Sequence, residues 1–309
     1  MPSAFEVSLS IGDTIVHLVS EDRRLALAAD GVLRQFAVTA HRRADVEITA
    51  RWTDTPDEPG GELIFDGGVP WQLARLDGES GDEFLFTFRS AMGGSVPYKT
   101  ARFNATFTVG DVRVYRPHFD RQGRDVVNPL EYPLDELLMI HLLSQGRGVE
   151  VHGCALVDGA GRAHVFAGQS GAGKSTLSRL WLGHPGVKLL SDERVVLRTD
   201  RDPIAVYGTP WHGDALLASP LSGDLAGVFF LNHAPINTVA PVSGSLTLAK
   251  LLSCSFLPFH GAGPVNQTIT AIESVVSQTR CYHLGFTPDA SVIETLEPYV
   301  FGTNTVAAR

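Results

Sequence analysis

Residues 167–176 read AGQSGAGKST, which is the spacing of a phosphate-binding loop. Glycines let consecutive backbone N–H groups turn inward around phosphates, the lysine reaches the β- and γ-phosphate oxygens, and the hydroxyl is a ligand for Mg²⁺. The stretch therefore predicts that the chain binds ATP together with Mg²⁺. The residues expected to contact the nucleotide are Gly168, Gln169, Ser170, Gly171, Ala172, Gly173, Lys174, Ser175 and Thr176.

The sequence on either side of this loop supports the prediction. Residues 163–167, AHVFA, are typical of a short buried strand, and residues 175–183 are typical of a helix with Leu177, Leu180 and Trp181 on one face. The loop would then lie at the N-terminus of a helix. Free N–H groups and the helix dipole favour an anion at such a position.

Composition limits the classes of protein to which the chain can belong. It has 309 residues, of which 44% are hydrophobic and 19% charged, as in a soluble globular protein. The net charge of −9 is spread along the sequence, whereas nucleic acids and anionic membranes are bound by basic surfaces. We therefore expect neither a nucleic-acid nor a membrane partner. The composition leaves open whether the chain forms an oligomer.

The cysteines and the N-terminal segment favour a cytoplasmic location. Cys154, Cys254 and Cys281 are far apart in the sequence, so neither a disulfide framework nor a zinc site is expected. The first residues show no basic start followed by an apolar block, as a signal peptide would. Residues 225–249 have no charged side chain, but prolines interrupt them, which favours a strand, a loop and the start of a helix over a membrane span.

Two halves of the chain differ in their hydrophobic rhythm. Residues 1–127 contain short alternating runs separated by turn residues, which predicts a β-rich, antiparallel N-terminal domain. A helix beginning near Pro133 and ending near Gly146 is expected to open the second domain, residues 128–309. The predicted fold class is α/β, or α+β overall, with a P-loop domain that follows a β-rich domain.

Acidic residues follow the next predicted strand after the loop helix. Val187–Leu190 form that strand, and Asp192 and Glu193 come directly after it. At the end of a strand that lies beside a phosphate-binding loop, one carboxylate can hold Mg²⁺ while the other accepts the proton of an attacking hydroxyl. These two acids, together with Ser175, are therefore the predicted metal ligands. The residues do not determine which acid takes which role.

The segment before the loop indicates a particular group of nucleotide-binding proteins. Residues 149–157 are typical of a strand, DGAG at 158–161 of a tight turn, and 163–167 of the returning strand that leads into the loop. Together, VHGCALVDGAGRAHVFAGQSGAGKST and LLSDERVVL resemble the catalytic domain of the HPr serine kinase/phosphorylase family. The resemblance covers roughly residues 149–198 and implies a fold related to that of phosphoenolpyruvate carboxykinase.

The resemblance also implies roles for individual residues. His152 would stand near the γ-phosphate, Lys174 and Ser175 would serve the nucleotide and Mg²⁺, and Asp192 and Glu193 would share the base and metal roles. The catalytic set is then His152, Lys174, Asp192 and Glu193. Glu193 stands where the family usually has an aspartate, and the family's basic signature loop has no counterpart in this chain.

The expected activity is ATP-dependent transfer of the γ-phosphoryl group to a hydroxyl. A serine of a protein or peptide is the expected acceptor. A polyol or sugar is the alternative acceptor, and a nucleotide-gated binding module with slow ATP hydrolysis is the alternative outside transfer enzymes. Trp211 and His212 in the turn-rich GTPWHG segment are candidate contacts at the edge of the site.

The N-terminal half is a candidate for acceptor recognition. Its segment VRVYRPHFDRQGR carries several arginines, which could form a basic patch on an acidic protein and attract an acidic acceptor over short distances. These arginines are Arg113, Arg116, Arg121 and Arg124. A solvated turn next to a linker is the alternative interpretation of the same segment.

Overall fold

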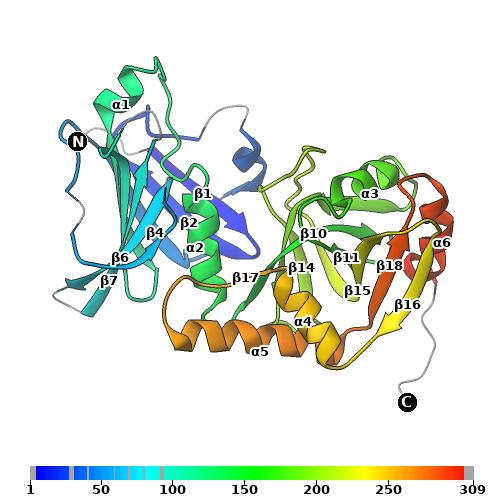
Figure 1. Cartoon of the computed structure of the whole chain (residues 1–309). Coiled ribbons are helices and arrows are strands. Elements are labelled where there is room, and N and C mark those ends of the chain that lie inside the picture. The colour runs from blue at the N-terminus through cyan, green and yellow to red at the C-terminus, as the bar shows by residue number, and fades with distance from the viewer. Residues whose placement is uncertain are drawn as a thin grey trace. The chain divides into compact units, whose positions relative to one another are not determined.

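The computed structural model describes residues 5–27, 31–39, 42–58, 60–68, 70–78, 81–90 and 94–302. The protein is mixed α/β, with two large sheets and few helices (Figure 1). It divides into two compact units. Unit 1 comprises residues 1–142 and 258–262, and unit 2 comprises residues 143–257 and 263–309.

A nine-stranded sheet forms most of unit 1, in the order β3-β1-β2-β4-β9-β8-β7-β6-β5. Its strands alternate as the sequence predicts. In β4 the side chains of Val46, Ile48 and Ala50 are buried and those between them are exposed. The strands are β1 (Phe5–Ile11), β2 (Thr14–Ser20), β3 (Ala37–Val38), β4 (Val46–Thr53), β5 (Glu62–Asp66), β6 (Trp71–Gly78), β7 (Gly81–Arg89), β8 (Pro97–Asn104) and β9 (Val109–Tyr115). The other elements are η1 (Val32–Phe36), α1 (Arg116–Asp120) and α2 (Leu134–Leu143).

The antiparallel prediction for this half is wrong at two pairings. β2 pairs with β4, and β4 pairs with β9, in parallel. Parallel neighbours need a long crossover connection, and the sequence supplies two. Residues 21–45 separate β2 from β4, and the whole of β5 to β8 separates β4 from β9. Alternation within a strand cannot reveal the direction of its neighbour.

Aromatic side chains pack against α2 in the core of unit 1. The ring of Phe107 stacks on His141 of α2, with centroids 4.5 Å apart. The segment 258–262 adds Phe259 against Trp71 at 4.8 Å and His260 against His141 at 4.7 Å. Helix α2 therefore belongs with unit 1 up to Leu142, although the sequence places it at the start of the C-terminal domain. The domain boundary near residue 128 stays a prediction, because packing units need not fold independently.

A buried lysine makes the stability of unit 1 depend on pH. Lys99 is 1% exposed, donates to the carbonyl of Glu131 at 3.2 Å, and burial lowers its pKa from 10.5 to about 8. The unfolded chain therefore binds more protons between these two values, and the free energy of unfolding rises with pH across the window. We expect a rise of up to roughly 3 kcal/mol.

Lys99→Met should remove this rise. Denaturant unfolding of the protein and the variant, followed between pH 7 and pH 10, measures the difference. Equal pH dependence in the two proteins would contradict the prediction.

The second sheet forms the core of unit 2, and five of its strands pair into a closed ring. β11 (Arg162–Ala167) pairs antiparallel with β10 (Gly148–Asp158) and parallel with β15 (Ser222–His233). β13 (Arg194–Arg198) and β14 (Ala205–Gly208) connect β10 back to β15. The remaining strands are β12 (Val187–Ser191) and β17 (Ser255–Phe256) along β10, and β18 (Cys281–Phe286) and β16 (Thr238–Val242) beyond β15.

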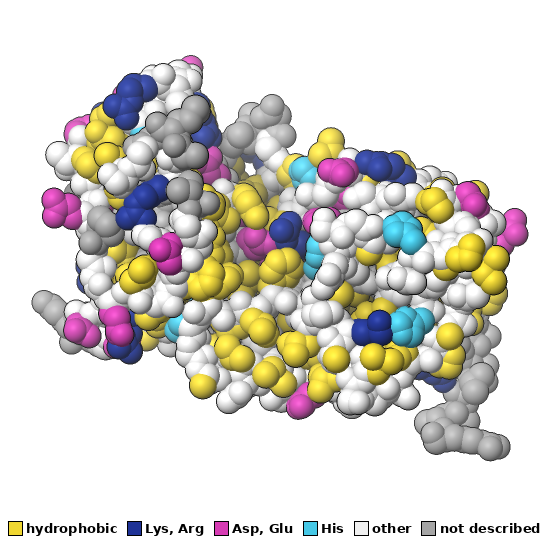
Figure 2. Space-filling view, viewed as in Figure 1, with side chains coloured by type: hydrophobic (Ala, Val, Ile, Leu, Met, Phe, Trp, Pro, Cys, Tyr) yellow, Lys and Arg dark blue, Asp and Glu magenta, His cyan; other side chains and the backbone are white. Residues whose placement is uncertain are grey.

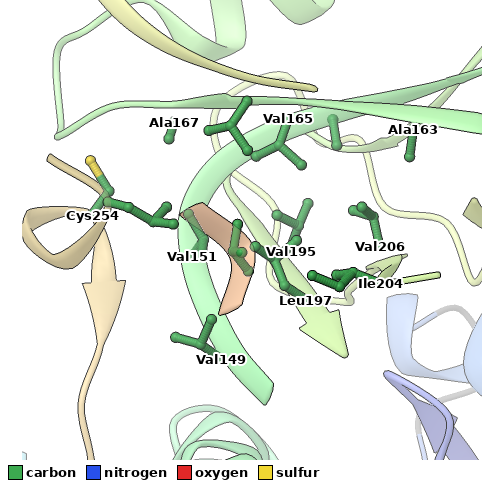
Figure 3. Packing of buried hydrophobic residues seen from close by; sticks show 14 of the residues in the cluster. Val149, Val151, Ala163, Val165, Ala167, Val195, Leu197, Ile204, Val206 and Cys254 are labelled. Carbon is green, nitrogen blue, oxygen red and sulfur yellow. The ribbon is translucent and has the colours of Figure 1, made fainter. Parts of the chain in front are cut away.

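Aliphatic side chains fill this ring. Figure 3 shows Val151, Val165, Val195 and Val206 directed into one packed cluster. The cluster is continued by buried residues of α4 (Ser245–Ser253) and α5 (Ala262–Gln278), including Leu251. A second cluster holds α3 (Lys174–Trp181) and α6 (Ser291–Val300) through their buried side chains, which include Trp181. The predicted hairpin of β10 and β11 and the helix after the loop are both confirmed.

The helix whose start is predicted within residues 225–249 is present but short. Helix α4 ends at Ser253, and β17 then pairs with β10 through the partners Val151 and Ser255. The backbone ladder to β10 supplies hydrogen bonds that a continued helix would have made internally. Phe259 packs in unit 1 instead. Within the described residues, no helix combines the length and the apolar character needed to span a membrane.

Candidate functional site

The glycine-rich loop, residues 168–173, connects β11 to the N-terminus of α3. Gly173 is the N-cap residue with φ 98°, and Gly171 has φ 80°. Both values lie in the left-handed region that glycine adopts without strain. A Cβ at Gly173 would also come within 2.5 Å of the ring of Phe286. Conformation and packing therefore both require glycine at residue 173.

A cavity of about 390 Å³ opens over this loop within unit 2. Its charged lining consists of three cationic side chains, Lys174, Arg179 and Arg194, and two carboxylates, Glu193 and Asp214. Such a mixed lining with an excess of cations suits an anionic ligand that also binds a metal ion. The other lining residues are Ser170, Gly171, Gly173, Ser175, Thr176, His212, Gly213 and His233.

Lys174 is a buried cation in the cavity wall. It is 4% exposed, and its Nζ donates to the carbonyls of Gly168 at 3.0 Å and Gln169 at 3.1 Å. Burial lowers its pKa, which the nearby Glu193 carboxylate, with Oε2 3.9 Å from Nζ, partly opposes. The ammonium group is thus held against the glycine-rich loop at the N-terminus of α3.

The predicted acids lie next to each other but have different surroundings. Asp192 is fully buried and accepts backbone N–H groups from Gly213 at 2.9 Å and Ala215 at 2.8 Å. The N–H of Leu217, at 3.3 Å, and the hydroxyl of Ser175, at 3.2 Å, complete its partners. A carboxylate has about four acceptor positions. Asp192 therefore uses its whole capacity to fasten the loop 213–217 and to orient Ser175.

Glu193 is partly exposed and faces the cavity. Its Oε1 accepts a hydrogen bond from Nε2 of His152 at 2.7 Å. This hydrogen bond is the main reason that the pKa of Glu193 is lowered, and the charge of Lys174 adds to it. The carboxylate is therefore ionised at neutral pH. Its second oxygen remains directed toward Lys174 and the cavity.

The backbone of β10 joins these parts. The His152 carbonyl accepts the N–H of Gly168, and the Gly153 N–H donates to the carbonyl of Glu193 at 3.0 Å. A Cβ at Gly153 would lie 3.1 Å from the carbonyl oxygen of Phe166, so glycine permits the close approach of β11. The His-Gly dipeptide thus connects the loop to the acids through both side chain and backbone.

The structure brings together all of the predicted catalytic residues, and it adds others that sequence reasoning missed. Nε2 of His233 donates to the carbonyl of Gly171 at 2.9 Å, and Arg179 donates to the carbonyl of Asp214 at 2.7 Å. A polar residue at the end of the buried strand β15 was the available signal for His233. Trp211, proposed as a contact at the site edge, is 5% exposed and does not line the cavity, whereas His212 does.

The arginine patch predicted on the N-terminal half is largely neutralised within unit 1. Arg113 pairs with Asp111 at 2.9 Å, and Arg124 pairs with Glu131 at 2.8 Å. Arg116 lies 3.7 Å from Asp54. On the face shown in Figure 2, acidic and basic side chains are interspersed. Recruitment of an acidic acceptor by this segment stays a prediction.

Oxygen atoms converge beside Gly213. A Cβ at this residue would lie 2.8 Å from Oε2 of Glu193 and 3.0 Å from Oδ2 of Asp192. It would also lie 3.2 Å from Oγ of Ser175. The absence of a side chain at Gly213 therefore leaves room at the three groups that the sequence assigns to Mg²⁺. This arrangement fits a cation bound to oxygen ligands.

A metal ion at this position would need additional ligands. Among the residues that the structure describes, no group of three or more His, Cys, Asp and Glu side chains is arranged to hold a metal ion. Mg²⁺ is commonly bound by one or two carboxylates together with water and substrate phosphates. Ser175 and Glu193 as donors, with Asp192 orienting Ser175, are consistent with that mode of binding.

Gly213→Ala is expected to weaken Mg²⁺ binding without unfolding unit 2. The new methyl group would press on the three oxygens, and displacement of metal-orienting groups typically costs roughly 10- to 100-fold in metal affinity. Mg²⁺ titration of nucleotide binding measures the shift. Gly263→Ala in α5 is the matched control, because a Cβ there meets no atom within 4 Å. Superimposable titrations for the two variants would contradict the prediction.

Comparisons with known proteins add no assignment to this site. No protein-family model matches the chain, and no curated protein is significantly similar to it. The chemistry of the cavity must therefore be inferred from its own residues and their geometry.

Proposed function

We propose that the protein is an ATP-dependent kinase that transfers the γ-phosphoryl group to a hydroxyl, with a serine of a protein or peptide as the acceptor. The observation that carries this proposal is the convergence of Lys174, Ser175 and the hydrogen-bonded pair of Glu193 and His152 on one cavity at the N-terminus of α3. The resemblance of residues 149–198 to the HPr serine kinase/phosphorylase family supports it independently of the geometry.

The cationic side of the cavity would hold the triphosphate. The N-terminus of α3 and the ammonium group of Lys174 attract the β- and γ-phosphates in a site where Lys174 is shielded from water. Mg²⁺, when bound, would neutralise charge on the phosphate oxygens. Ser175 and Glu193 would be its nearest protein groups. Asp192 supports them by accepting a hydrogen bond from the Ser175 hydroxyl, so that the lone pairs of the hydroxyl oxygen are left for the metal ion.

This arrangement divides the roles that the sequence leaves open. Because the four acceptor positions of Asp192 are used by the loop and by Ser175, Asp192 serves as a positioning residue. Glu193 retains an oxygen toward the cavity and accepts the hydrogen bond of the acceptor hydroxyl, so that the hydroxyl oxygen is aligned with the γ-phosphorus. The low pKa of Glu193 makes it a weak base. It therefore orients the hydroxyl and takes up the hydroxyl proton late, as the bond from the acceptor oxygen to phosphorus forms.

The proposal is tested by measuring transfer directly. The full chain is incubated with Mg²⁺ and γ-labelled ATP, together with a serine-containing peptide library, the same library with alanine in place of serine, or a panel of polyols and sugars. We expect label on the serine library only. Label on polyols would identify the small-molecule kinase.

Two other outcomes would reject transfer. Slow ADP release that no acceptor accelerates would indicate a binding module with ATP hydrolysis. Absence of ATP binding would reject every version of the proposal. Lys174→Ala provides the background for each measurement.

A further inference from the structure

Arg194 is a cation in the cavity wall to which neither the sequence nor the proposed mechanism assigns a role. It follows Glu193 directly at the start of β13 and lines the same cavity. In the ladder between β10 and β13 it is the partner of His152. Directly opposite residues project from the same face of a sheet. Arg194 and His152 therefore lie side by side at the edge where Glu193 faces the cavity.

The guanidinium of Arg194 is supported from beneath. Its Nε lies 3.6 Å from Oε1 of Glu150, whose side chain is fully buried. Its Cζ lies 5.3 Å from the ring centroid of Phe256. Glu150 is two residues before His152 on β10, and Phe256 is the partner of Glu150 on β17. A buried carboxylate and an aromatic face thus fix the guanidinium, which reduces the entropy lost when it binds a ligand.

The charge of Arg194 acts at the centre of the site. It contributes to lowering the pKa of Lys174 and the pKa of Glu193, after burial and closer partners. The other cations of the cavity are engaged with backbone carbonyls. Lys174 donates to Gly168 and Gln169, and Arg179 donates to Asp214. Arg194, which follows Glu193 in the chain and lines the same cavity, lies against the side chains of Glu150 and Phe256.

We propose that Arg194 is a catalytic residue that donates hydrogen bonds to the oxygens of the γ-phosphoryl group as that group passes from ATP to the acceptor. This inference rests on the proposed kinase function. In the step, the bond between the γ-phosphorus and the β,γ-bridging oxygen breaks, and its electron pair stays on the β-phosphate of ADP. The bond from the acceptor oxygen to the γ-phosphorus forms, and the hydroxyl proton passes to Glu193. Arg194 keeps its protons.

The planar guanidinium explains why arginine suits this position. It presents two parallel N–H groups to neighbouring phosphoryl oxygens, whereas a lysine presents a single point charge. Charge on the equatorial oxygens matters most in the transition state, where an arginine typically contributes roughly 10³- to 10⁵-fold to turnover. The residue should therefore affect the rate of transfer much more than the binding of ATP.

The test compares Arg194→Gln and Arg194→Lys with Arg280→Gln, which removes an exposed arginine of unit 2 outside the cavity, as the control. We expect Arg194→Gln to bind Mg²⁺·ATP within about threefold of the parent, because ground-state binding is left to the loop and Lys174. We expect its single-turnover transfer to fall by roughly 10³-fold or more. Its affinity for Mg²⁺·ADP with aluminium fluoride, a planar mimic of the transferring group, should fall in parallel. Arg194→Lys should recover only part of either loss.

A folding defect is separated by a double variant. Arg194→Gln removes the cation beside the buried Glu150, and loss of a buried charge partner destabilises a fold. The double variant Arg194→Gln with Glu150→Gln removes both charges. We expect it to have the melting temperature of the parent and still to lose single-turnover transfer and affinity for the aluminium fluoride complex.

Parent-like transfer or parent-like affinity for the fluoride complex in these variants would overturn the inference, as would a loss of ATP binding equal to that of Lys174→Ala. If the parent itself transfers no phosphoryl group, the proposed function fails, and the fluoride complex still reports on Arg194.

Discussion

Replacing Glu193 with glutamine is expected to lower phosphoryl transfer by roughly 10²- to 10⁴-fold, with a much smaller loss of Mg²⁺·ATP affinity. Glutamine keeps the size of the side chain, and its amide oxygen can still accept a hydrogen bond from His152. It cannot take up the proton of the acceptor hydroxyl. Single-turnover transfer and equilibrium nucleotide binding, measured on the same preparation, separate the two effects.

The control is Glu273→Gln, which removes an exposed carboxylate from α5 and should leave both quantities unchanged. If Glu193→Gln transfers at the parental rate, Glu193 is not the base. Asp192, the other predicted acid, would then be the candidate for that role.

The pH dependence of the same reaction follows from the pKa of Glu193. The His152 hydrogen bond holds this pKa below the ordinary value of 4.5, so the ionised form persists well into acid. Transfer should therefore be insensitive to Glu193 titration at neutral pH and should decline only below that value. His152→Ala removes the hydrogen bond, so the pKa rises and the acid limb of the profile moves to higher pH. If the acid limb of the profile does not move in His152→Ala, the His152 hydrogen bond does not control the ionisation of Glu193 during transfer.

Lys174→Ala is expected to remove most nucleotide-dependent activity. A preorganised donor aimed at developing charge typically contributes roughly 10²- to 10³-fold to turnover, and Lys174 is shielded from solvent where its charge acts most strongly. Because Lys174 also contacts the ground-state phosphates, ATP affinity should fall together with the rate. Titration with a fluorescent ATP analogue and a transfer assay measure the two losses.

The fold of this variant should survive. Burial opposes the charged form of Lys174, as its lowered pKa shows, so removing the ammonium group also removes an unfavourable burial. The hydrogen bonds to the loop carbonyls are the structural loss. Lys188→Ala, at an exposed position of β12, controls for loss of a lysine in general. Parent-like ATP affinity in Lys174→Ala would leave the glycine-rich loop without a role in nucleotide binding.

Much of the site could be predicted because its parts are local in the sequence. The loop, the helix after it and the hairpin before it are each specified by residues within a short stretch. Gly173 needs its left-handed backbone, and Asp158 accepts the N–H groups of Ala160 and Arg162 in the hairpin turn. The acids were found because they follow a recognisable strand.

The sequence by itself therefore determined the glycine-rich loop, its flanking elements and the residue types that meet beside it. Only the tertiary structure decided how Asp192 and Glu193 differ, because Asp192 is occupied by backbone N–H groups of residues 213–217, and backbone groups carry no residue-specific signal. It alone placed Arg194 over Glu150 and Phe256, and His233 on the Gly171 carbonyl. These contacts join segments far apart in the chain, and strand pairing, which sequence periodicity does not encode, sets which segments meet.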